Sequence, residues 1–182
     1  MRKAEILVAA ETLFQHYGFV ETTVADIARE AGIGVGTVYL EFSSKDSISA
    51  TLCRQHREEI LQSMQAVINS SGNYSERFVQ VLEARQKALA GSVREGLHGS
   101  DVLFAACEAT RQINRNFDEA ESRLLAKFLQ DGNQAGAFSV PDVSSAAGII
   151  LRIYDTICSQ RPSDGFATLH ALVLGGVLRR VG

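Results

Sequence analysis

Apolar residues recur at spacings of three and four along most of this chain of 182 residues, which is the period of an α-helix. A first stripe of this kind ends at Gly18. Strand-like alternation of apolar and polar residues is absent, and only two prolines interrupt the chain. The pattern therefore predicts an all-α fold. The apolar positions of the first stripe are Ile6, Ala10, Leu13, Phe14 and Tyr17.

Two short helices joined by a glycine turn are predicted next. Thr23 is a good N-cap, and Asp26 lies three residues later, where an acidic group faces the positive end of a helix. Gly32 follows the last apolar position of this helix, as a helix-terminating glycine does. A second apolar pair, Val38 and Phe42, follows after Ile33, which can fill the gap at the turn. Helices this short need a shared core, so the pattern predicts a helix-turn-helix.

Six further helices are predicted, separated by polar or glycine-containing loops. Glycines near the end of the fourth of them, Gly132 and Gly136, indicate fraying there. We expect residues 1–46 to form a helix-turn-helix domain and residues 47–182 to form a second helical domain. The six helices are expected at about 44–68, 76–89, 101–113, 117–135, 141–159 and 163–180.

Residues 22–45 resemble the signature of the TetR/AcrR family of bacterial transcriptional regulators. The resemblance implies that residues 1–46 bind DNA, with Thr23, Tyr39 and Lys45 on phosphates. It also implies that Val35, Gly36 and Thr37 approach the base edges. The positions that match the family pattern are Thr23, Ala31, Gly32, Ile33, Thr37, Val38, Tyr39, Phe42 and Lys45.

The chemistry of these side chains agrees with those roles. A hydroxyl, a phenol and an ammonium all bind phosphate oxygens, and Thr37 can touch a thymine methyl or donate to a base edge. Gly36 lets the backbone come close to the duplex. The alternatives are that the Tyr39 ring packs on the core and that Lys45 is simply solvated.

Two positions depart from the family pattern. Gly34 replaces the usual serine at the start of the recognition helix, so no hydroxyl is offered to a phosphate there. Glu41 occupies a position that often carries an aromatic residue or histidine. Its carboxylate would repel phosphate, so we expect it either to face away from DNA or to accept from a cytosine amine.

The charge balance of the predicted DNA-binding domain is unusual for a nucleic-acid binder. Residues 1–50 carry four basic and seven acidic side chains. Positive charge must therefore be placed locally, at Arg2 and Lys3 on a frayed N-terminus and at Lys45 beside the DNA. We expect weak non-specific binding and a modest dependence on salt.

The resemblance implies a dimer and an effector cavity in the second domain. Two helices from each subunit would form the interface, so that a two-fold dimer reads two half-sites of a pseudo-palindrome. Val143 and the following apolar positions are more numerous than one buried face requires, although both helices could equally be internal core. The interface candidates are Ala146, Ala147, Ile150, Ile157, Leu169, Leu172, Val173, Gly176 and Val177. The cavity candidates, for which core packing is the alternative, are Phe78, Leu82, Phe104, Cys107, Arg111, Phe128 and Tyr154.

Catalytic and metal chemistry find no support in the sequence. Cys53 and His56 have ligand spacing, but no second pair accompanies them. Cys53, Cys107 and Cys158 are odd in number and widely spaced, which fits buried thiols in a reducing cytoplasm better than a disulfide framework or a redox sensor. No apolar run is long enough to span a membrane, and no cofactor is expected.

The sequence therefore predicts a cytoplasmic, homodimeric transcriptional repressor that binds double-stranded DNA and is released by a small-molecule effector. Two alternatives stay open. One is a DNA-binding regulator or activator that needs no effector. The other is a helical small-molecule-binding protein in which the helix-turn-helix is only scaffold.

Overall fold

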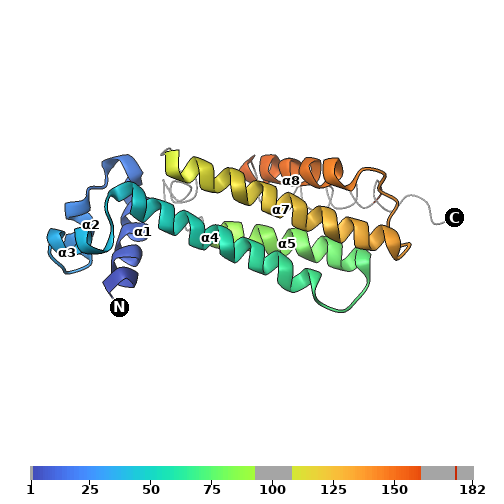
Figure 1. Cartoon of the computed structure of the whole chain (residues 1–182), viewed down its shortest axis with the longest axis horizontal. Coiled ribbons are helices and arrows are strands. Elements are labelled where there is room, and N and C mark those ends of the chain that lie inside the picture. The colour runs from blue at the N-terminus through green and yellow to red at the C-terminus, as the bar shows by residue number, and fades with distance from the viewer. Residues whose placement is uncertain (1, 93–107, 161–174, 176–182) are drawn as a thin grey trace. The chain divides into compact units, whose positions relative to one another are not determined.

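A computed structural model describes residues 2–92, 108–160 and 175, and all the regular structure in these residues is helical (Figure 1). The all-α prediction is confirmed. None of the described helices is long and apolar enough to cross a membrane. The helices are α1 (Arg2–Glu21), α2 (Val24–Glu30), α3 (Val35–Glu41), α4 (Lys45–Ile68), α5 (Tyr74–Ser92), α7 (Glu108–Gln134) and α8 (Val143–Gln160).

Several sequence predictions fall outside the described residues. They are the start of the helix expected at 101–113, all but residue 175 of the helix expected at 163–180, and the effector candidates Phe104 and Cys107. The same holds for five interface candidates and for the side chains of Ile157 and Cys158. The five are Leu169, Leu172, Val173, Gly176 and Val177.

The chain forms two compact units, which we call the N-terminal unit and the second unit. The N-terminal unit contains residues 1–60 and 87–117, and the second unit contains residues 61–86 and 118–182. This division assigns residues 45–60 of α4 to the unit that holds the helix-turn-helix. The domain boundary expected at residue 46 stays a prediction.

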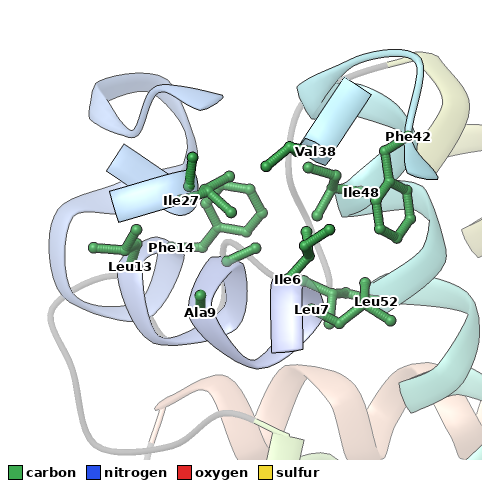
Figure 2. Close-up of a cluster of buried hydrophobic side chains, with 12 residues drawn as sticks. Ile6, Leu7, Ala9, Leu13, Phe14, Ile27, Val38, Phe42, Ile48 and Leu52 are labelled. Atoms are coloured by element: carbon green, nitrogen blue, oxygen red, sulfur yellow. The ribbon is translucent and has the colours of Figure 1, made fainter. Parts of the chain in front are cut away.

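Side chains from the first four helices form the core of the N-terminal unit. Figure 2 shows Phe14 of α1, Ile27 of α2 and Val38 of α3 pointing toward one another, with Ile48 of α4 beside them. All four are at most 1% exposed. Ile33 is partly buried against this cluster and fills the turn, as expected. Helices of seven residues are stable here because they share this core.

Two expectations for α1 are wrong. Tyr17 is 61% exposed although its spacing continues the apolar stripe, and Gly18, which follows it, breaks the helix with a φ of 83°. Arg2 and Lys3, which were expected on a frayed N-terminus, are helical, since α1 begins at Arg2. Lys3 lies in the first turn, with its ammonium 5.2 Å from the centre of the Phe42 ring.

The predicted break between residues 113 and 117 does not exist, because α7 is one helix from Glu108 to Gln134. Neither glycine nor proline occurs between residues 108 and 131. Its asparagines are held by side-chain partners instead of ending the helix. Asn114 accepts from Arg57 Nε at 2.9 Å, and Asn116 accepts from Gln112 at 2.8 Å.

The end of α7 is an ordered cap, not the frayed end that its glycines suggested. Gly136 adopts a φ of 72°, and the amides of Ala137 and Phe138 both donate to the Gly132 carbonyl. The Asn133 side chain donates to the Val140 carbonyl and accepts from the Val140 amide, at 2.7 and 3.0 Å. Together these bonds satisfy backbone groups that a helix end leaves free.

Four aromatic rings pack together at this end of the second unit, with centres 5.5 to 6.0 Å apart. Gly132 makes room for them, because a Cβ atom there would lie 2.1 Å from the Phe138 ring. Glycine is therefore required for close packing at this point of α7. The rings are those of Tyr74, Phe78, Phe128 and Phe138.

A buried ionic cluster joins α5, α7 and α8. Arg85 donates from Nε to Glu121 at 2.5 Å and from Nη1 to Asp155 at 2.7 Å. The Arg85 and Glu121 side chains are 3% and 1% exposed. Burial opposes the charge of Arg85, but the two carboxylates outweigh that cost and raise the pKa of the guanidinium. Arg85 is therefore charged inside the protein.

Helix α8 turns a different face outward from the one predicted for the interface. Ala147 and Ile150 are 0% and 5% exposed, so both are buried within the chain itself, and Ala146 is half-buried. The large apolar side chains that reach solvent are Ile149 and Ile153, at 48% and 38% exposed. Helix α8 carries apolar residues on its exposed face as well as on its buried face. The spacing of these residues did not show which of the two faces the chain itself would cover.

Candidate nucleic-acid interface

The turn between α2 and α3 is held almost entirely by backbone geometry. Gly32 adopts a φ of 67°, its amide donates to Arg29, and the Ile33 amide donates to Ala28 at 2.9 Å. These two bonds form a Schellman motif, which glycine at the left-handed position favours. The glycine turn predicted at Gly32 is confirmed.

Thr23 and Asp26 form a capping box at the start of α2. Thr23 donates to Asp26 Oδ2 from its hydroxyl at 2.6 Å and from its amide at 3.1 Å. The Asp26 amide donates to the Thr23 hydroxyl oxygen at 3.1 Å. The Thr23 bonds, followed by Arg29, lower the pKa of Asp26. Because Asp26 takes both donors of Thr23, a phosphate oxygen would have to compete for the hydroxyl proton.

Helix α3 presents a mostly apolar surface to solvent, with Glu41 as the charged residue at its end. Val35, Tyr39 and Leu40 are 40%, 54% and 83% exposed, while Val38 is 1% exposed in the core. Tyr39 is thus available for a phosphate contact and is not packed on the core. A Cβ atom at Gly36 would meet nothing within 4 Å, so the backbone is open to close approach at this position. Thr37 is half-buried at the side of this surface.

Lys45 has a structural role that the sequence did not reveal. Its ammonium donates to the carbonyls of Phe19, Thr22 and Val20, at 2.6, 2.7 and 3.3 Å. It also lies 4.4 Å from the centre of the Phe19 ring. A cation at the carbonyl end of α1 is favourable for the helix dipole. Lys45 therefore ties the end of α1 to the start of α4, and its contact with DNA stays a prediction.

The effector candidates are not brought together as one group. Phe78, Leu82, Phe128 and Tyr154 are buried in the second unit. Arg111 belongs to the N-terminal unit, is 61% exposed, and pairs with Glu108 at 3.2 Å. The structure therefore favours a solvated Arg111 side chain over one that pairs with an acidic effector. Among the described residues, Arg57 and Arg85 are the buried arginines, and a charged residue within an apolar helical stripe was the sequence signal for both.

Cys53 and His56 each have another role than binding a metal. Cys53 is buried and bonds to Asn114, which agrees with a buried thiol. His56 Nε2 lies 3.1 Å from Glu11 of α1, and its Nδ1 lies 3.7 Å from Glu59. The bond to Glu11 raises the pKa of His56 against the effect of burial. Protonated His56 therefore ties α4 to α1.

The short paired helices, their glycine turn and the exposed α3 define a helix-turn-helix protein of the kind that places one helix in the DNA major groove. Residues 6–50 match the family model described as bacterial regulatory proteins, tetR family. The chain is 30% identical over 164 residues to the uncharacterized HTH-type transcriptional regulator YfiR of Bacillus subtilis, covering 86% of this chain and 78% of that one. The chain belongs to the tetR family and is a DNA-binding transcriptional regulator.

Two further relatives resemble the chain over most of its length. The HTH-type transcriptional repressor KstR2 of Mycobacterium tuberculosis is 32% identical over 149 residues, covering 78% of this chain and 71% of that protein. The solved structure of the fatty acid degradation regulator FadR from Bacillus halodurans superposes with a TM-score of 0.77 at 22% identity. It covers 98% of this chain and 97% of FadR, so the fold extends beyond the helix-turn-helix.

Proposed function

We propose that the protein is a homodimeric repressor that leaves its operator when a small apolar molecule binds the second domain. The observation that carries the proposal is the outward face of α3, where Val35, Tyr39 and Leu40 are exposed around the open backbone of Gly36. A surface of this kind suits insertion into the major groove. Residues 1–46 would form the DNA-binding domain and residues 47–182 the effector and dimerisation domain.

The proposed DNA contacts follow the accessible groups of α3 and its flanks. Tyr39 would bind phosphate through its exposed phenol, and Val35, Gly36 and Thr37 would approach base edges. Thr23 and Lys45 would contact phosphate only by sharing donors that Asp26 and the α1 carbonyls now occupy. We expect them to contribute less than Tyr39.

The effector proposal rests on the aromatic interior of the second unit. Phe78, Leu82, Phe128 and Tyr154 are buried there, so an effector that binds among them would meet mainly aromatic and apolar side chains. Relatives named as a fatty acid metabolism regulator and as a ketosteroid regulator are consistent with an apolar effector. Binding can shift operator affinity only if the effector prefers one of two conformations.

Ile149 and Ile153 are the proposed centre of the dimer interface, in place of Ala147 and Ile150. They line a shallow groove on α8 with Arg152 and Thr156. Two α8 helices meeting at a two-fold axis would cover both isoleucines on each subunit. Since chromosomal DNA is the proposed partner, we place the protein in the bacterial cytoplasm.

The test is binding of the purified protein to the intergenic DNA beside its own gene, at stated salt and against random competitor DNA. We expect a specific complex with a two-fold footprint, lost in Tyr39→Ala and kept in Val8→Ala, which also removes exposed apolar surface. Fatty acyl and steroid compounds are then added to the complex. Release by one of them supports the repressor, whereas binding that no compound changes favours a regulator without an effector.

The non-DNA alternative makes a different prediction in the same assay. If a folded dimer bound neither the intergenic DNA nor any sequence enriched from a random library, the helix-turn-helix would be scaffold only. Dimerisation is tested separately by sedimentation of Ile149→Asp, with Ser144→Asp, an exposed position of α8 outside this groove, as a control of equal charge. A monomeric Ile149→Asp beside a dimeric control supports the proposed interface.

A further inference from the structure

The recognition helix lacks the side chains that usually read bases. Residues 33–44 contain no arginine, lysine, histidine, asparagine or glutamine. These are the residues that form paired hydrogen bonds with guanine and adenine in the major groove. The polar side chains that remain on α3 are Thr37, Tyr39 and Glu41. The preference of the protein for one DNA sequence must therefore depend mainly on contacts other than paired hydrogen bonds to guanine and adenine.

The exposed apolar side chains of this helix supply another way to read sequence. The structure describes eight large apolar side chains that are exposed, and three of them lie on the seven residues of α3. The thymine methyl group is the apolar feature of the major groove, and apolar side chains recognise it by contact. An apolar helix surface and a methyl-bearing base edge are complementary partners.

Leu40 is the side chain best placed for that contact. It follows the buried Val38 by two residues, which is a rotation of about 200° around a helix with 3.6 residues per turn. Leu40 therefore points almost directly away from the core, and its exposed fraction of 83% is the largest among the large apolar side chains described. Gly36 lies one turn earlier on the same line and carries no side chain. Nothing along that line therefore holds Leu40 away from the floor of the groove.

We propose that Leu40 is the main specificity-determining residue of α3 and that it reads thymine through the 5-methyl group. The proposal rests on the DNA-binding function proposed above and adds the chemical class of the base that is recognised. It predicts an operator with a thymine in each half-site whose methyl group packs on Leu40. Glu41, which is also exposed, would then lie at the edge of the contact and not at its centre.

Deoxyuridine tests the contact directly, because it differs from thymidine only by the missing methyl group. The operator is first enriched from a random duplex library with the purified full-length protein. Each thymine of that operator is then replaced by deoxyuridine, one symmetric pair at a time. Burial of one methyl group predicts a loss of affinity of about fourfold for each half-site, and therefore about fifteenfold for a symmetric pair.

Leu40→Ala identifies the side chain responsible. We expect this variant to bind the thymine and deoxyuridine operators equally at the sensitive position, because the methyl group has lost its partner. The variant should fold normally, since Leu40 is exposed. Val8→Ala, which shortens an exposed valine of α1, should keep the full deoxyuridine penalty.

Two results would overturn the inference in distinguishable ways. If an operator is enriched but no deoxyuridine replacement weakens binding, or if Leu40→Ala keeps the penalty, the protein binds DNA specifically and Leu40 does not read thymine. If no sequence is enriched by a folded dimer, the DNA-binding function itself fails and the inference fails with it.

Discussion

The N-terminal unit and the second unit use their polar side chains differently. In the first, the bonds of Thr23, Asp26 and Ser47 that cap α2 and α4 span three residues along the chain, and the longer-range bonds of Lys45, His56 and Arg57 all come from α4. In the second, Arg85 reaches Glu121 and Asp155, which are 36 and 70 residues away. The local bonds do not involve the outer face of α3, whereas the distant bonds of Arg85 hold three helices together. Changes in α3 should therefore affect DNA binding, and changes around Arg85 should affect stability.

The largest expected effect comes from breaking the buried cluster of the second unit. Arg85→Met leaves Glu121 as a buried carboxylate without its main partner, which costs about 3–5 kcal/mol of unfolding free energy. Urea denaturation measures this loss. Arg123→Met, which removes an exposed pair with Glu119, should cost less than about 1 kcal/mol. Similar losses in both variants would show that the buried pair has no special role.

At Lys45 one side chain serves both stability and the proposed DNA contact. Lys45→Met removes charged hydrogen bonds to three carbonyls and should cost about 1.5–3 kcal/mol. Thermal unfolding checks this, with Lys87→Met, an exposed lysine, as the control. Unchanged stability with weakened DNA binding would mean that the ammonium faces phosphate and leaves the end of α1.

The same glycine-to-alanine change should act oppositely in the two units. Gly132→Ala forces a methyl group against the Phe138 ring and should destabilise the protein by about 1–3 kcal/mol. Gly36→Ala meets no neighbour and should stabilise by up to about 1 kcal/mol, yet weaken operator binding by keeping the backbone from the duplex. Denaturation and operator titration of both variants test this. Stronger DNA binding by Gly36→Ala would exclude close backbone approach.

The smallest expected effect is a pH dependence carried by His56. Glu11 raises the pKa of His56 in the folded protein, so the protonated form stabilises the fold. This contribution is complete below the unfolded value near 6.5 and is lost as the pH rises through the folded pKa. Melting temperatures between pH 5.5 and 9 should fall more for the natural protein than for Glu11→Gln. Parallel curves would show that the pair contributes nothing.

Local signals predicted the helix-turn-helix well. Thr23, Asp26 and Gly32 act through bonds to their immediate neighbours, and their roles can be read from spacing alone. The roles of Tyr17 and Lys45 could not be read in this way. Spacing places Tyr17 on the apolar stripe of α1 although it is exposed, and the partners of Lys45 lie 23 to 26 residues earlier.

Periodicity alone was less informative for the second unit. It identified the apolar stripe of α8 but not which side the chain itself covers, so Ala147 and Ile150 were assigned to the wrong surface. It also divided α7 at asparagines that partners on α4 and α7 hold in the helix. These features depend on which helices become neighbours, and spacing within one helix does not contain that information.

The acidic balance of residues 1–50 has a consequence for how the protein finds its site. Arg29 is already paired with Asp26, and Lys45 with backbone carbonyls, so few cations are left to hold arbitrary DNA. A regulator that grips non-target DNA weakly spends little time sliding and locates its operator mainly through encounters from solution. Occupancy of the operator should then depend closely on the number of protein copies in the cell, because few copies are bound to the rest of the chromosome.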